Sequence, residues 1–319
     1  MSTLKSKLHR ASQGLSSLLK GQLRFVVIGL VVFFLTKTLL DHGQGVLSLR
    51  LGSAGLASLA IALGMTLLAH ILAGIVWANI LHDLGQSVAY DWGMAVYLKT
   101  NIAKYIPGNV WHFYGRLQAS QTAKVPSTIA AISILLEPLL LVLAAIALAT
   151  VGLQPLAAWQ DGGWRWGIQG GILLVILIAM HPKFLNFGIQ QLMRWKQKTL
   201  GGAEVNLALV HYPWRSFLGE LSFLLLRGIG FFLVCLAVSP FAIDHVQVLY
   251  SGFAIAWLLG FIIPGLPGGV GVFEAVALTL LNPFLPTTDL LGILAIYRLI
   301  NTIAEALGAG LVVLAERRI

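Results

Sequence analysis

Charged side chains inside apolar segments are the residues of this sequence that could do chemistry. Arg227 and Arg298 each lie near the middle of an apolar run, with Glu220 seven residues before the first and Glu305 seven residues after the second. A spacing of seven is about two helical turns, so each pair is expected to share one helix face. Glu137 occupies a third run. Because a mid-membrane charge costs at least about 2.5–3.5 kcal/mol, these groups are expected to face the protein interior.

The same charges suit the binding of an anionic head group. Arginine offers a planar fork that matches phosphate or carboxylate, and glutamates would hold the arginines when no substrate is bound. An internal ion-pair network that only fastens helices together is the alternative. The residues predicted to bind substrate are Arg116, Glu137, Arg227, Glu274, Arg298 and Glu305.

Two related motifs lie 160 residues apart, at Pro107–Gly115 and Pro267–Ala275, and both read P-G-[NG]-V-x-x-F-x-[GA]. Proline lacks an N–H and glycine adopts backbone angles closed to other residues, so each motif is expected to break a helix. Broken backbone survives in a membrane only inside protein or beside a water-filled cavity. A cavity-lining role is therefore predicted, with kinked structural helices as the alternative. The residues assigned to the breaks are Pro107, Gly108, Asn109, Pro267, Gly268, Gly269 and Gly271.

The composition of the 319 residues indicates the environment of these charges. The chain is 58% hydrophobic and 10% charged, whereas a soluble domain has about 45–50% apolar and about 25% charged residues. The sequence therefore predicts an all-α polytopic membrane protein, with residues 1–319 as a single integral membrane domain. A soluble enzyme, a disordered chain and a fibrous protein are excluded. The net charge of +9 is interpreted as an orientation signal, so no nucleic-acid partner is expected.

Hydropathy predicts about six full spans. A helix needs about 20 mostly apolar residues to cross the hydrocarbon core. The predicted spans are 22–40, 56–82, 126–152, 166–181, 215–238 and 288–314. Two further apolar regions, 94–117 and 247–283, contain the Pro/Gly motifs and are expected to be re-entrant segments or half-helices.

The basic residues set the expected orientation. Most of the 21 Lys and Arg lie in the N-terminal segment, in 83–125, in 182–215 and in the C-terminal tail. Cytoplasmic loops retain such residues, so both termini are expected on the cytoplasmic side. The protein is expected in the inner membrane of the cell. Segment 182–214 is predicted as a cytoplasmic basic loop, part of which could lie on the inner leaflet.

The order of spans predicts an inverted repeat. Each interrupted region follows two spans and precedes one long span, and the two regions start from opposite sides of the membrane. Residues 22–152 and 166–314 are therefore expected to be two inverted halves. Inverted repeats with broken helices at matching positions are typical of transporters.

The remaining residues predict no catalytic, metal or cofactor site. The single Cys235 excludes a disulfide framework, and the eight histidines include no H-E-x-x-H spacing. No Walker A sequence is present, so the chain is not expected to hydrolyse ATP or to be an enzyme. His112, inside the first motif, could bind a head group or sense protons. His70 is expected to be an ordinary packed or interfacial histidine.

The runs Asn101–Trp111 and Pro267–Glu274 resemble the lysylphosphatidylglycerol synthase transmembrane family, from the second span to the last. The resemblance implies lipid handling without lipid synthesis. In the larger members the membrane domain is regarded as a flippase, and an extra soluble domain, expected to be absent here, carries the aminoacylating activity. The positions that match the family signature are Pro267, Gly268, Gly269, Gly271 and Glu274.

Three functions follow as hypotheses. The first is a flippase-like translocator of a polar or anionic phospholipid or glycolipid. The second is a membrane-embedded transferase acting on a lipid carrier, with Glu137 or Glu274 as general base. The third is a non-catalytic subunit of a lipid-modifying complex. An exposed helix face of small residues would mark its partner surface, but pairs such as Gly228 and Gly230 are too common in membrane helices to identify one. A homo-oligomer or a lipid-biosynthesis partner is compatible with any of them.

Overall fold

The computed structural model describes residues 52–106, 110–151, 164–200, 209, 211–239, 245–263, 269 and 271–316. These ranges are helical and contain no strand, which confirms the all-α prediction. Predicted span 22–40 lies outside the described residues, as do five motif residues: Pro107, Gly108, Asn109, Pro267 and Gly268.

Four helices are long and apolar enough to cross a membrane. They are α2 (Ser53–Asp83), α5 (Ser127–Val151), α8 (Trp214–Val238) and α11 (Thr287–Glu316). Each matches a predicted span, namely 56–82, 126–152, 215–238 and 288–314. At about 1.5 Å per residue, even the shortest exceeds the hydrocarbon core of about 30 Å. The described residues thus indicate a multi-pass membrane protein.

The fifth span is bent. Helix α6 (Trp164–Ala179) is followed by α7 (Pro182–Leu200) at an angle of 55°, and the pair is apolar enough to form one broken span. Proline is favoured at a first helical position because its missing N–H has no partner there. Pro182 therefore starts α7 within the segment predicted as a cytoplasmic basic loop, and the side of the membrane on which this segment lies remains a prediction.

Both Pro/Gly regions are interrupted as predicted. The first contains α3 (Tyr90–Asn101), the 3-10 helix η1 (Ile102–Tyr105) and α4 (Trp111–Thr122). The second contains α9 (Val246–Ile262) and α10 (Val272–Leu281). The order long, short, short and long therefore occurs from α2 to α5 and again from α8 to α11. The inverted orientation of the two halves remains a prediction.

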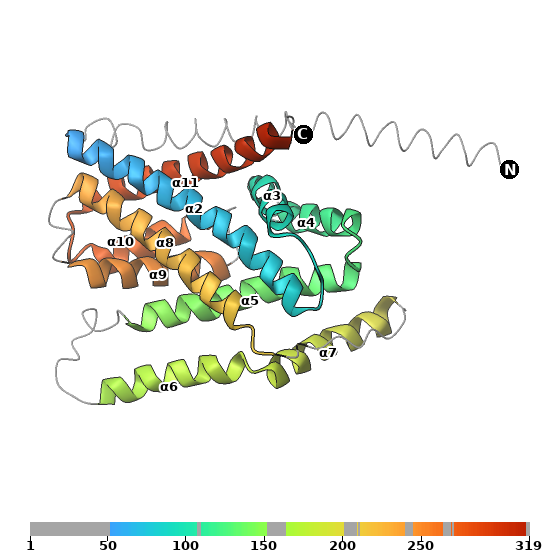
Figure 1. Ribbon diagram of the computed structural model, residues 1–319. Coiled ribbons are helices and arrows are strands. Elements are labelled where there is room, and N and C mark those ends of the chain that lie inside the picture. The colour runs from blue at the N-terminus through green and yellow to red at the C-terminus, as the bar shows by residue number, and fades with distance from the viewer. Residues whose placement is uncertain are drawn as a thin grey trace.

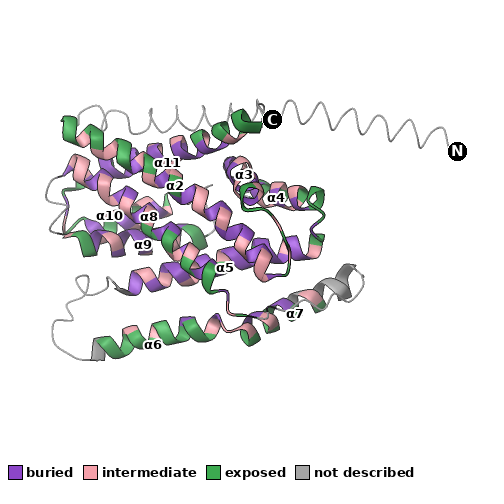
Figure 2. Ribbon diagram, viewed as in Figure 1, coloured by how far each residue is buried: buried purple, intermediate pink, exposed green. Residues whose placement is uncertain are grey.

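The helices form a bundle around α2 and α8, which lie side by side (Figure 1). Helices α9 and α10 pack at one end of this pair, α3 and α4 lie by the other end, and α11 runs along α2 to reach α3. Helix α5 crosses beneath α8 and separates the bundle from α6. Figure 2 shows that α6 is exposed along most of its length, and its exposed side chains include Leu174 and Val175. Such a surface suits contact with lipid.

Glycines allow close contact between helices. A Cβ on Gly219 of α8 would lie 2.4 Å from Val76 Cγ2 of α2, and one on Gly230 would lie 2.9 Å from Thr66 Oγ1. Within a membrane, small residues at helix contacts let backbones approach and gain van der Waals contact. Gly228 packs on Tyr250 in the same way. Gly228 and Gly230 thus serve contacts inside the protein rather than an exposed partner surface.

One glycine of α2 tests this packing. A Cβ on Gly74 would lie 2.6 Å from Met94 Cα, a backbone atom of α3 that a rotamer change cannot move away. We expect Gly74→Ala to destabilise the protein by about 1–3 kcal/mol, the usual cost of overpacking. Gly64→Ala, on the same helix with no atom within 4 Å, is the matched control and should be neutral. Thermal unfolding in detergent measures both, and equal midpoints would contradict the packing account.

Candidate anion-binding cavity

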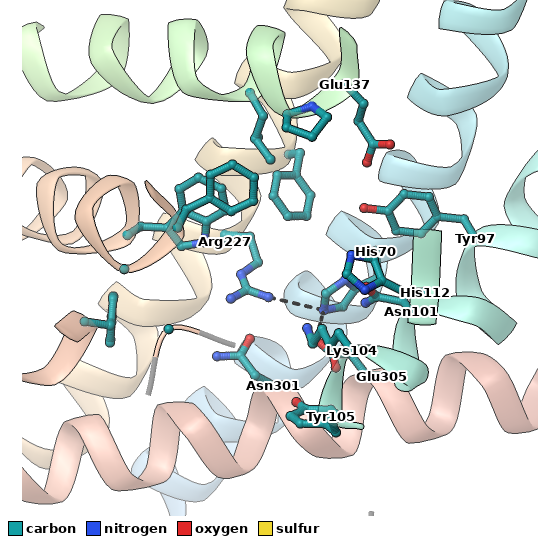
Figure 3. Close-up of a pocket in the computed structure, with 18 of the residues that line it drawn as sticks. His70, Tyr97, Asn101, Lys104, Tyr105, His112, Glu137, Arg227, Asn301 and Glu305 are labelled. Atoms are coloured by element: carbon teal, nitrogen blue, oxygen red, sulfur yellow. Dashed lines mark hydrogen bonds and ion pairs between the residues drawn. The ribbon is translucent and has the colours of Figure 1, made fainter. Parts of the chain in front are cut away.

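A cavity of about 220 Å³ lies inside the bundle and collects polar side chains from helices far apart in the sequence (Figure 3). Its lining comes from α2, α3, η1, α4, α5, α8, α9, α10 and α11 together with Gly269. The structure brings all six residues predicted to bind substrate to this one cavity: Arg116, Glu137, Arg227, Glu274, Arg298 and Glu305.

The remaining lining is mainly apolar and aromatic. Leu141, Phe223, Trp257, Phe261 and Phe273 line the cavity beside the charged groups. Trp257 stacks on Phe261 with ring centroids 5.1 Å apart, which holds both rings in place. A cavity with charged and apolar lining matches an amphiphilic ligand better than a free ion.

A deeply buried ion pair joins α4 to α5. Arg116 and Glu137 are 2% and 5% exposed and form an ion pair through Nη1 and Oε2. The guanidinium also lies 3.9 Å from the centroid of the Tyr97 ring, as a cation–π contact. Glu137 thus holds Arg116 in the absence of ligand, as the sequence analysis predicted for such carboxylates.

A second pair joins α10 to α11 in a more open part of the cavity. Glu274 Oε1 accepts a hydrogen bond from Arg298 Nε at 2.6 Å, and both side chains are about one-fifth exposed. Glu274 Oε2 accepts the backbone N–H of Gly271 at 2.7 Å, which fixes the start of α10. Gly271 has φ +89°, a conformation that favours glycine.

Gly269 has a related role at the break before α10. Its φ is +71°, and a Cβ there would lie 2.7 Å from the carbonyl oxygen of Gly260 on α9. Glycine is therefore required both for the backbone angle and for the close approach. Gly269 thus lies directly against Gly260 of α9 and lines the cavity, as predicted for this motif position.

Glu305 of α11 connects α11 to η1 and α2. Its Oε1 atom lies 2.5 Å from Lys104 Nζ and 3.3 Å from His70 Nε2. Its Oε2 atom is buried and makes no hydrogen bond within the described part of the chain. Lys104 is about one-fifth exposed, whereas Glu305 is almost fully buried. The carboxylate is thus the shared partner of two basic side chains.

Arg227 of α8 differs from the other cavity arginines. Among the residues that the structure describes, no carboxylate forms an ion pair with it. Its Nε donates to the Tyr297 hydroxyl at 3.1 Å, and its Nη1 lies 3.2 Å from His70 Nε2. The residue is 8% exposed. Since a buried charge is costly without a counter-ion, this guanidinium is a candidate anion-binding group.

The contacts between charges run across helices rather than along them. Sequence spacing placed Glu220 with Arg227 and Arg298 with Glu305, but neither pair forms an ion pair within the described residues. Arg298 instead contacts Glu274, and Glu305 contacts Lys104. Glu220 is 2% exposed and does not line the cavity; its Oε1 has no hydrogen-bond partner in the described structure. Residues seven apart lie about 10.5 Å apart along one helix, so charges that share a face take their partners from neighbouring helices.

Sequence reasoning gave His70 no part in the site. The residue is packed as expected, at 3% exposed, yet it contacts both Arg227 and Glu305. Tyr297 and Asn301 also line the cavity without having been singled out. The available signal was their polarity within apolar spans, since every such group needs a partner there. Among the described residues, no group of three or more His, Cys, Asp or Glu is placed to hold a metal ion.

Comparison with known families identifies the family of the chain. The model of the lysylphosphatidylglycerol synthase transmembrane region matches residues 22–308, so the chain belongs to this family. The family is a membrane domain associated with lipid modification or flipping. No curated protein matches the chain.

The buried Arg116–Glu137 pair gives a stability prediction. Arg116→Met leaves the Glu137 carboxylate buried without its partner, which should cost about 3–5 kcal/mol. Adding Glu137→Leu should recover most of that loss, because the pair is then replaced by apolar groups. Lys99→Met is the control. It removes the more exposed contact with Glu316, 35% and 52% exposed, and should cost less than about 1 kcal/mol. Chemical unfolding in detergent measures all three, and a double variant as unstable as the sum of the single variants would contradict the prediction.

Proposed function

We propose that this protein translocates a membrane lipid with an anionic phospholipid or glycolipid head group between leaflets. The observation that carries the proposal is Arg227, a buried guanidinium in the cavity without a described carboxylate partner. A phosphate or carboxylate there would supply the missing counter-ion through charge-assisted hydrogen bonds. Membership of a family associated with lipid modification or flipping supports this ligand class.

The size of the cavity favours a head group over a whole lipid. Its volume of about 220 Å³ is below the range of about 300–1,000 Å³ typical of sites for drug-sized ligands. The head group would enter beside the charged wall, while the acyl chains stay in the surrounding bilayer. The aromatic side chains around Trp257 and Phe261 offer apolar contact to the first carbons of those chains.

The cavity lies between the two predicted halves of the chain. His70, Lys104, Arg116 and Glu137 belong to the first half, and Arg227, Glu274, Arg298 and Glu305 belong to the second. Rocking of one half against the other would expose such a central site alternately to each leaflet. The ion pairs at the boundaries, such as Lys104–Glu305, would open and close during this motion. Movement would be downhill unless an ion gradient is coupled to it.

The same geometry gives less support to a transferase. Glu137 and Glu274, the carboxylates considered as general bases, are each held by an arginine. Each carboxylate already has an oxygen engaged by a guanidinium, so it is less free to accept a proton from a substrate. The ion pairs therefore suit binding and release of an anion better than proton abstraction.

Reconstitution tests the proposal. In liposomes containing head-group-labelled phosphatidylglycerol, purified protein should accelerate the exposure of label to a membrane-impermeant quencher. Arg227→Gln should slow this exchange at least about tenfold, since loss of one charge-assisted contact costs about 1.5–3 kcal/mol. Arg227→Lys should retain part of the rate. Arg194→Gln, an exposed position on α7, is the charge-matched control and should behave like the wild type.

Two results would contradict the proposal. One is wild-type protein that accelerates no anionic, zwitterionic or glycolipid probe. The other is an Arg227→Gln protein that folds and translocates at the wild-type rate. Consumption of an activated lipid donor would instead point to the transferase.

The proposal includes an inverted topology. The protein would lie in the inner membrane with both termini on the cytoplasmic side. Val110, before α4, and Ile263, at the end of α9, are 56% and 44% exposed. In a Cys235→Ala background, Val110→Cys and Ile263→Cys should react with a membrane-impermeant thiol reagent from opposite sides. Labelling of both from the same side of intact cells or inverted vesicles would contradict the inverted arrangement.

A further inference from the structure

One ring nitrogen of His70 faces two groups that make opposite demands on it. Nε2 lies 3.2 Å from Arg227 Nη1 and 3.3 Å from Glu305 Oε1, as the dashed lines in Figure 3 mark. An unprotonated Nε2 accepts a hydrogen bond from the guanidinium. A protonated Nε2 donates to the carboxylate and repels the guanidinium. Both contacts cannot be satisfied in one protonation state.

The charges around His70 decide which state is favoured. Arg227 reaches it from α8, Glu305 from α11 and Lys104 approaches from η1. Two cations therefore face one carboxylate, so without ligand the neutral imidazole is the better neighbour and accepts from Arg227. The other titratable or polar groups that α3, η1, α4, α5, α10 and α11 contribute to the cavity are Tyr97, Asn101, Tyr105, His112, Arg116, Glu137, Glu274, Tyr297, Arg298 and Asn301.

An anionic head group would reverse this balance. We propose that His70 is a proton-binding site whose occupation is coupled to the binding of the anionic lipid head group at Arg227, so that lipid and proton are carried together. The proposal rests on the proposed function. The anion would draw the guanidinium away from Nε2 and add a negative charge beside the ring. The imidazole would then bind one proton from the aqueous phase, and its Nε2–H would donate a hydrogen bond to Glu305 Oε1.

The coupling is reciprocal by thermodynamic linkage. If bound anion favours the protonated ring, a protonated ring must favour bound anion by the same factor. One coupled proton limits the effect to about tenfold in affinity per pH unit, with tighter binding at lower pH. Release of the head group into the other leaflet would return Arg227 to Nε2 and release the proton on that side. A proton gradient would then bias the direction of lipid movement.

Calorimetry of ligand binding tests this coupling directly. The purified full-length protein in detergent is titrated with dihexanoyl phosphatidylglycerol in two buffers of different ionisation enthalpy, at several pH values. For the wild type we expect net uptake of a fraction of one proton, rising toward one across the titration range of His70. His70→Gln keeps an acceptor for Arg227 but cannot be protonated, so it should bind without this uptake and without the pH dependence.

His112→Gln identifies which histidine is responsible. His112 lies in the same cavity, and its buried Nδ1 has no hydrogen-bond partner in the described structure, yet no ion pair or hydrogen bond joins it to Arg227 or Glu305. This variant should retain proton uptake. Thermal unfolding of both variants verifies folding, and His70→Asn serves as a second acceptor variant if His70→Gln is unstable.

The outcomes separate the two proposals. Binding by the wild type without proton uptake, or equal uptake by His70→Gln, overturns the role of His70 and leaves lipid translocation standing. Absence of binding together with absence of translocation overturns the proposed function and this inference with it. Uptake that is lost in His70→Gln and kept in His112→Gln establishes the coupling.

Discussion

The structure depends on the cost of placing charge inside an apolar bundle. Each buried carboxylate or basic group must find a partner, because the interior offers little water to replace one. Arg116 with Glu137, Arg298 with Glu274, and Lys104 with Glu305 meet this requirement across neighbouring helices. Arg227 meets it only through Tyr297 and His70 among the described residues. The distribution of partners thus leaves one arginine available to a ligand.

The helix breaks and the ion pairs together position the short helices beside the cavity. In each half, the helix after the break is joined to the next long helix by an arginine–glutamate pair. Arginine lies on α4 and glutamate on α5 in the first half, whereas the charges are exchanged between α10 and α11 in the second. The breaks place these short helices beside the cavity, and the glycines at 269 and 271 make the second break possible.

Hydropathy and the cost of buried charge predicted much of this molecule. The spans α2, α5, α8 and α11 follow from apolar runs of membrane length, and the breaks follow from Pro/Gly motifs at matching positions. The six charged residues of the site were identified because a charged side chain in such a run must face inward. Their partners were not predictable, since a small rotation of a helix exchanges one neighbour for another. Arg298, for example, contacts Glu274 on α10 rather than Glu305 on its own helix.

The contacts of His70 and the start of α7 were not predicted from the sequence. A histidine in an apolar run needs a polar partner, but its sequence position does not identify that partner, and only the fold places Arg227 and Glu305 beside it. The bend between α6 and α7 occurs where Pro182 starts a new helix. The basic composition of segment 182–214 did not predict that helix.

The central claim is that the guanidinium of Arg227 binds the anionic head group of a lipid inside the cavity. A structure determined in nanodiscs rich in phosphatidylglycerol tests it most directly. The account predicts a lipid phosphate within hydrogen-bonding distance of Arg227, with the acyl chains leaving the cavity past the aromatic side chains. An empty cavity, with lipids bound only on the outer surface of the bundle, would contradict it.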